Sequence, residues 1–160
     1  MSQKTVVRAF VFNQNGEILL TRHKENAPWV LPGWHVESWE TLHEAMLREL
    51  SEEFSLEARF FDIDTEERLH HKGKKLTQFA LPIANYQLSY TDDKGNDKSR
   101  TEYIFLMETD MEIEETQVEE IFEYGWFEVD EILSMKPNIE TWDFYIEMLD
   151  RIMGDEGEEE

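Results

Sequence analysis

Cysteine is absent from the 160-residue chain, which excludes disulfides, thiolate catalysis and thiolate zinc sites and fits a reducing compartment. Long apolar runs are also missing: nowhere do about 18 apolar residues follow one another, so no membrane-spanning helix is expected. The opening residues 1–4 lead straight into a strand-like run, without the apolar core of a secretory signal. We therefore predict a cytoplasmic protein with no membrane partner.

Basic residues are scarce, because 15 lysines and arginines stand against 37 acidic residues and give a formal net charge of −22. Such a charge repels a polyphosphate backbone and removes the counterion release that drives polymer binding. A nucleic-acid polymer is therefore not an expected partner. Small phosphorylated ligands stay compatible with the charge, since a divalent cation between carboxylate and phosphate reverses the local sign.

The length is that of one ordinary domain, and a hydrophobic content of 40% is enough for a core. We predict one domain over residues 1–153. Residues 154–160 have no apolar side chain, so we predict an acidic disordered tail there.

Strand-like and helix-like runs alternate along the chain, which predicts a mixed α/β fold. Val6–Phe12 and Ile18–Leu20 read as a hairpin joined by the turn residues 13–16. A helix is expected from Thr41 to Phe54, because Thr41 and the glutamate three residues later form a capping-box pattern. Further strands are predicted at 58–63, 79–90, 103–107 and 124–127, and further helices at 129–135 and 141–153.

The first predicted helix has carboxylates where its apolar stripe should be. The apolar face consists of Leu42, Ala45, Met46 and Leu50. Glu49 and Glu53 fall within this stripe and Glu52 beside it. Three such carboxylates repel one another unless cations neutralise them, and Mg²⁺ or Mn²⁺ prefers oxygen ligands. In a chain this acidic, a glutamate-rich helix is also typical of a solvated face, so the helix alone leaves both interpretations open.

The residues around this helix closely resemble the Nudix box, a loop–helix–loop motif. The family pattern is Gly, five residues, Glu, seven residues, then Arg-Glu-aliphatic-any-Glu-Glu-any-Gly-aliphatic. Residues 31–56 keep this spacing, with Glu40 as the first acidic residue, Arg48 and Glu49 as the pair, and Glu52 and Glu53 after them. The resemblance extends more loosely over the whole chain, from the opening hairpin to the segment before Trp126.

The resemblance implies a fold and an activity. The fold is a Nudix-type sandwich of a mixed β-sheet between helices. The activity is metal-dependent hydrolysis of a phosphoanhydride bond in a nucleoside diphosphate derivative or nucleoside triphosphate, with Mg²⁺ or Mn²⁺ as cofactor. The expected partner is therefore a small nucleotide-like diphosphate, and a homodimer is left open.

The resemblance also implies roles for single residues. The metal ligands would be Glu49, Glu52, Glu53 and the carbonyl of Gly33. Among the catalytic residues, Glu49 would be a ligand or orienting base, Arg48 would hold the glutamates, and Glu120, with Glu119 as alternative, would add a further carboxylate. Glu40 would support the loop or an outer metal. The predicted substrate-binding residues are Arg22, Trp34, His35 and Lys72, the last within the basic run 68–75, for which a solvated loop is the alternative.

Two positions depart from the pattern, because Trp34 and Ser55 replace the two glycines of the box. Serine can approximate the left-handed helix end that glycine serves. The indole of Trp34 can stack on a substrate base or obstruct the pocket. The departure keeps a second class open, a Nudix-fold sensor that binds a nucleotide without cleaving it. A diphosphate isomerase on the same fold is disfavoured, since those enzymes usually rely on cysteine.

Overall fold

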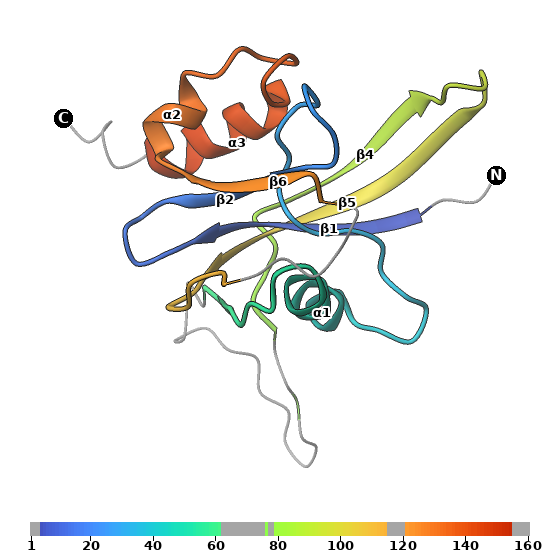
Figure 1. The fold of residues 1–160 in the computed structure, drawn as a ribbon. Helices are drawn as coiled ribbons and strands as arrows, with labels where there is room; N and C mark the ends of the chain where they lie inside the picture. Colours follow the sequence, from blue (N-terminus) through green and yellow to red (C-terminus); the bar gives the residue numbers. More distant parts are fainter. Residues whose placement is uncertain (1–3, 62–75, 77–78, 115–120, 155–160) are drawn as a thin grey trace.

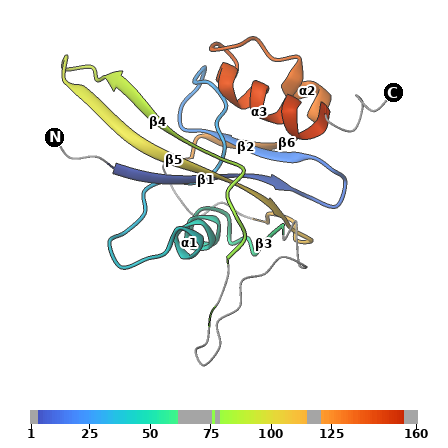
Figure 2. The same ribbon diagram turned by 180° about the vertical axis from the view of Figure 1, so that it is seen from behind.

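The computed structural model describes residues 4–61, 76, 79–114 and 121–154. A mixed six-stranded sheet lies between helix α1 (Leu42–Phe54) on one face and helices α2 (Val129–Leu133) and α3 (Asp143–Gly154) on the other (Figures 1 and 2). The predicted sandwich of a mixed sheet between helices is confirmed. Within the described ranges, the helices are too short or too polar to cross a bilayer.

The sheet is built around the pairing of its two longest strands. β1 (Lys4–Phe12) runs parallel to β5 (Asp97–Glu108), in register from Lys4 opposite Arg100 to Phe12 opposite Glu108. The other pairs are antiparallel: β2 (Ile18–Arg22) with β1 and with β6 (Glu123–Phe127), and both β3 (Arg59–Phe60) and β4 (Ala84–Thr91) with β5. The hairpin of β4 and β5 projects beyond the helices (Figure 1).

Side chains of β1 alternate between two cores, as the period of a strand requires. Val7, Ala9 and Val11 pack with α1, whereas Phe10 packs in the cluster that contains α2 and α3. Arg8 occupies the same face as Phe10 and is buried. A buried arginine needs partners, and Arg8 is described with the site below.

Several predicted boundaries differ from the observed ones. The hairpin and the helix at 41–54 are confirmed. The predicted strand 79–90 is wrong at its start, because β4 begins at Ala84, and Pro82 cannot donate to a ladder. β5 is longer than predicted, β3 is only two residues, α2 ends at Leu133 and α3 begins at Asp143. Of the predicted tail, Gly154 is the last residue of α3, and 155–160 lie outside the described residues.

The loop before α1 inserts between β1 and β2. Val7 and Ala9 of β1 donate to the carbonyls of Trp34 and Pro32, at 3.0 and 3.2 Å. On the other side, Thr21 of β2 exchanges two backbone hydrogen bonds with Val30. The segment 30–36 is therefore held by the sheet on both sides, and it delivers the chain to α1 in a fixed position.

Candidate functional site

Gly33 is the tightest point of this segment. Its φ of +130° is rare for L side chains, and a Cβ there would lie 1.9 Å from the carbonyl oxygen of Val7. The carbonyls on either side of Gly33 accept bonds from β1. Among the described residues, none donates a hydrogen bond to the carbonyl of Gly33 itself. Glycine is therefore required here by the close approach to β1.

Helix α1 is fixed at both ends by local interactions. Thr41 accepts a hydrogen bond from the backbone of Glu44, whose carboxylate bonds back to Thr41, so the predicted capping box is present. At the other end Ser55 adopts the left-handed conformation with φ of 52°, as the pattern predicted. Between these caps the helix buries Glu49 together with its apolar face.

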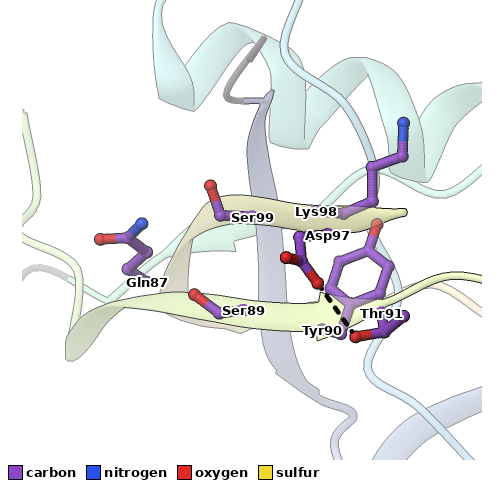
Figure 3. Close-up of a pocket in the computed structure, with 7 residues that line it drawn as sticks. All are labelled: Gln87, Ser89, Tyr90, Thr91, Asp97, Lys98 and Ser99. Atoms are coloured by element: carbon purple, nitrogen blue, oxygen red, sulfur yellow. Dashed lines mark hydrogen bonds between the residues drawn. The ribbon is translucent and has the colours of Figure 1, made fainter. Parts of the chain in front are cut away.

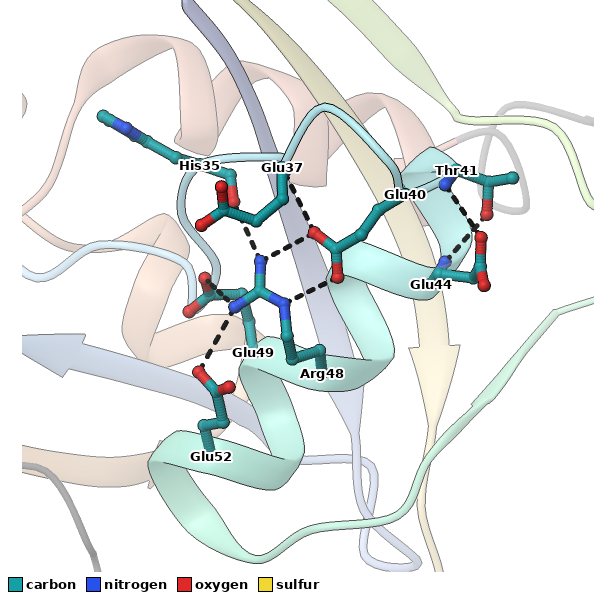
Figure 4. Close-up of polar contacts among 8 residues, drawn as sticks. All are labelled: His35, Glu37, Glu40, Thr41, Glu44, Arg48, Glu49 and Glu52. Carbon is teal, nitrogen blue, oxygen red and sulfur yellow. Dashed lines mark hydrogen bonds and ion pairs between the residues drawn. The ribbon is translucent and has the colours of Figure 1, made fainter.

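Arg48 joins the box loop to the helix (Figure 4). Its Nε and Nη2 donate to the two oxygens of Glu40, at 2.6 and 2.9 Å, and Nη2 also donates to the carbonyl of His35 at 3.1 Å. Nη1 donates to Glu49 at 3.0 Å and to Glu52 at 3.2 Å. We call this set the box network: His35, Glu40, Arg48, Glu49 and Glu52.

The charges of the box network support one another. The hydrogen bonds from Arg48 to Glu40 lower the pKa of Glu40 and raise the pKa of Arg48. The side chain of Glu40 is 7% exposed and that of Glu49 10%, so their ion pairs are less screened than surface pairs. Three carboxylates still share one guanidinium, so the box network is net negative.

The donor set of α1 fits a hard divalent cation in its chemistry. Glu49 and Glu52 already direct one oxygen each at the same nitrogen of Arg48, so a positive charge lies between them. Glu53 is half-buried and its charge acts on buried Arg8. As the side chains stand, no three acidic or histidine groups converge on a common metal position within the described ranges. A cation would therefore have to draw the glutamates away from Arg48.

Trp34 lies over a second set of charged residues. Its ring stacks on His35 at 4.4 Å, and the guanidinium carbons of Arg8 and Arg100 lie 5.5 and 5.8 Å from its centroid. Burial lowers the pKa of His35, and the positive charges of Lys4 and Arg100 lower it further. The predicted substrate-binding residues Trp34 and His35 are thus neighbours at the edge of β1.

Buried Glu102 connects the charges beneath Trp34. It accepts hydrogen bonds from the Tyr86 hydroxyl and from Nε of Arg100, both at 2.6 Å, and lies 3.4 Å from Nε of Arg8. Burial raises the pKa of Tyr86, which keeps its hydroxyl a donor. We call Arg8, Tyr86, Arg100 and Glu102 the sheet network.

The remaining predicted site residues fall elsewhere. Arg22 is paired with Glu123 and stacks on Trp29 at 4.6 Å, on β2 and β6. No contact joins it to the box network in the described part of the chain. Lys72 and Glu120 lie outside the described residues.

A shallow hollow of about 410 Å³ lies on the projecting hairpin (Figure 3). Polar side chains of β4 and β5, among them Ser89, Asp97 and Ser99, line it. No residue of the box lines it, so the hollow is separate from the candidate site.

Sequence reasoning missed the sheet network. One signal was present, because Arg8 interrupts an otherwise apolar strand, and a charge in a buried strand needs a partner. The partner could not be found from the pattern, since Glu102 is far away in the sequence and reaches Arg8 only through the pairing of β1 with β5.

The sandwich fold and the charged box helix behind a constrained glycine define a class of phosphoanhydride hydrolases, and comparisons with known proteins agree. A family model described as the NUDIX domain matches residues 2–149. The chain therefore belongs to the Nudix family, and its class is that of the Nudix-type nucleotide pyrophosphohydrolases, as predicted. A comparison with curated proteins found no significant match.

Solved structures share the fold at low sequence identity. A MutT protein from Methanosarcina mazei Go1 is 20% identical with a TM-score of 0.63, covering 99% of both chains. A hydrolase of the NUDIX family from Clostridium perfringens is 19% identical with a TM-score of 0.67, covering 95% of this chain and 99% of the other. An ADP-ribose pyrophosphatase from Streptococcus suis is 17% identical with a TM-score of 0.58, covering 94% and 92%.

Proposed function

We propose that this protein hydrolyses a pyrophosphate bond in a nucleoside diphosphate derivative or nucleoside triphosphate with Mg²⁺ or Mn²⁺. The observation that carries the proposal is that Glu49 and Glu52 both accept from one nitrogen of Arg48. The other two nitrogens of Arg48 form a bidentate pair with Glu40. Arg48 also ties these carboxylates to the loop that contains Gly33, because it donates to the carbonyl of His35. A hard cation is the group that such a donor set favours.

The proposed ligands are Glu49, Glu52, Glu53 and the carbonyl of Gly33. When bound there, the cation would polarise the phosphates and lower the pKa of a water molecule. Arg48 orients the glutamates and ties them to the loop, so it acts as a positioning residue. Glu40 fixes Arg48 and also accepts from the backbone N–H of Glu37 at 2.9 Å.

The general base and the substrate contacts belong to the same proposal. Glu49 is the candidate within the box, and Glu120 is the candidate outside it. Trp34 and His35 would contact the base or sugar of the substrate, while Arg22 and Lys72 remain predicted contacts to its phosphates. The cytoplasmic location and the homodimer also remain predictions, and light scattering on the purified protein tests the second.

A non-catalytic nucleotide-binding protein is the second candidate function. Two observations favour it: Trp34 replaces a box glycine, and Arg48 engages the same glutamates that would bind metal. A full set of box glutamates argues against it, because a binder has little use for all of them.

The experiment is a substrate panel read by mass-resolved products. It would contain ADP-ribose, a nucleotide sugar, a dinucleoside polyphosphate and an oxidised nucleoside triphosphate. We expect cleavage of at least one compound with Mg²⁺ or Mn²⁺ and none in chelator. Tight nucleotide binding without any product across the panel would establish the binding protein instead.

A further inference from the structure

The arginines of the described residues differ in how many carboxylates surround them. Arg48 contacts three, Arg59 two, and Arg22 and Arg151 one each. Arg8 and Arg100 share a single carboxylate, that of Glu102. When only these ion pairs are counted, the sheet network is the arginine site of the described ranges where positive charge exceeds negative charge; Glu53 also raises the pKa of Arg8, but less than Glu102 does. This excess is notable in a chain with a net charge of −22.

The sheet network is costly to bury. The side chain of Glu102 is 0% exposed and that of Arg8 6%. Nε of Arg8 has no hydrogen-bond partner, although Nη1 donates to the carbonyl of Leu31 at 2.8 Å. Buried ion pairs seldom gain stability over apolar residues of similar size. The network therefore calls for an explanation other than stability.

Arg100 is the charged member of the sheet network that reaches solvent, because Arg8 and Glu102 are buried. Its side chain is 20% exposed, and its guanidinium carbon lies 5.8 Å from the ring of Trp34 and 5.4 Å from the ring of Tyr90. Glu102 accepts from Nε, and neither Nη1 nor Nη2 donates a hydrogen bond to any of the described residues. Exposed Lys4 lies opposite Arg100 in the register of β1 and β5.

We propose that Arg100, flanked by Trp34, binds a phosphate group of the substrate outside the bond that is cleaved, and that Glu102 positions Arg100 for this contact. The substrate class is then a nucleotide-like diphosphate that carries at least one further phosphate. This inference rests on the proposed function, because it concerns the same substrate.

The chemistry of the guanidinium supports this assignment. Its two terminal nitrogens form a planar fork that matches two phosphate oxygens. Glu102 fixes the other side of the fork, which reduces the rotamer entropy lost on binding. In a chain of net charge −22 a further phosphate of a ligand is repelled unless a positive group lies beside it, and Arg100 supplies such a group.

The test measures binding of inorganic pyrophosphate by calorimetry, in chelator and at low salt. The proteins are the wild type, Arg100→Gln, and Arg151→Gln as a control of equal charge on the exposed face of α3, where Arg151 is 76% exposed. We expect Arg100→Gln to weaken binding by at least about fivefold, the loss of a charge-assisted contact. Arg151→Gln should bind like the wild type.

Equal affinity in the wild type and Arg100→Gln would overturn the proposal, and so would equal losses in both variants or no binding by the wild type. Arg100→Lys guards against misfolding, because it keeps the charge beside Glu102 but loses the fork, and it should bind with intermediate affinity. Neither metal nor turnover enters this test. A protein that hydrolyses nothing can therefore still pass it, and an active enzyme can still fail it.

Discussion

The box network and the sheet network combine the same residue types in opposite proportion. In the box network one arginine contacts three glutamates, and Glu52 is 59% exposed. In the sheet network two arginines share one glutamate that is fully buried. When only these ion pairs are counted, the first set is net negative and partly open to solvent, whereas the second is net positive and mostly closed to water.

This difference teaches how an acidic protein can accommodate a phosphorylated ligand. Glu49 and Glu52 lie one turn apart on α1 and Glu40 lies in the loop just before it, so the repulsion among these carboxylates is local and a cation can relieve it. The sheet network depends on the pairing of β1 with β5, so its charges are fixed by the fold. We therefore expect changes to the sheet network to reduce stability most, and changes to the box network to alter the response to metal.

The largest effect should follow from Glu102→Gln. The substitution leaves Arg8 and Arg100 without a counterion in a buried position, which typically costs about 3 to 5 kcal/mol. Urea unfolding measures the change in free energy. The exposed control Glu147→Gln should cost less than about 1 kcal/mol. Equal losses in the two variants would mean that the sheet network is no more critical than a surface pair.

The next effect concerns Arg48→Met, measured in chelator and then with Mn²⁺. Without metal the variant leaves Glu40 and Glu49 unpaired near the protein interior, and we expect a loss of about 2 to 3 kcal/mol. Mn²⁺ should stabilise the variant more than the wild type, because no guanidinium competes for the glutamates. An equal rise in melting temperature for both proteins would show that Arg48 and the ion do not share ligands.

A smaller effect should appear in the pH dependence of stability when Glu40 of the box network is replaced. The folded pKa of Glu40 is lowered by Arg48, so its charge stabilises the fold above the ordinary carboxyl pKa, and this contribution is lost as the pH falls through the lowered value. Glu40→Gln should therefore cost about 1 kcal/mol at pH 7. The difference from the wild type should shrink as the pH falls below the ordinary carboxyl pKa and through the lowered pKa of Glu40. A difference independent of pH would assign the loss to packing instead of charge.

Much of the box could be predicted because its determinants are local. Thr41 and Glu44 form the capping box, and Ser55 takes the left-handed helix end, each within one turn of the predicted boundary. The spacing of the glutamates also fixed their place on α1. Local patterns of this kind are readable from one sequence because nearby residues decide them.

The rest depended on contacts between distant segments. The register of β1 and β5 brings Glu102 beneath Trp34, and no periodicity reveals that pairing. Arg22 is another example: its pairing with Glu123 across β2 and β6 could not be read from the sequence, and its contact with the substrate stays a prediction. Residues 79–83 carry strand-like side chains, but Pro82 cannot donate to a ladder and β4 begins only at Ala84, so these residues precede the strand.

The smallest effect should come from Ser55→Gly. Ser55 belongs to neither network, so this variant shows how much the free energy of unfolding changes when only the backbone conformation at the end of α1 is affected. Glycine adopts φ of 52° without the Cβ penalty, so we expect a gain of at most about 1 kcal/mol. Ser51→Gly, in the interior of α1, should instead lose about 0.5 kcal/mol, the difference in helix propensity between serine and glycine. Thermal unfolding of both variants gives the comparison, and a loss for Ser55→Gly would contradict the cap assignment.

The central claim is that the box glutamates hold a catalytic cation, and Mn²⁺ binding measured by electron paramagnetic resonance tests it most directly. The proteins are the wild type, the double variant Glu52→Gln with Glu53→Gln, and a control of equal charge, Glu57→Gln with Glu112→Gln, whose residues are exposed. We predict that the double variant loses both tight Mn²⁺ binding and hydrolysis, while the control keeps both. Unchanged Mn²⁺ binding in the double variant would contradict the account.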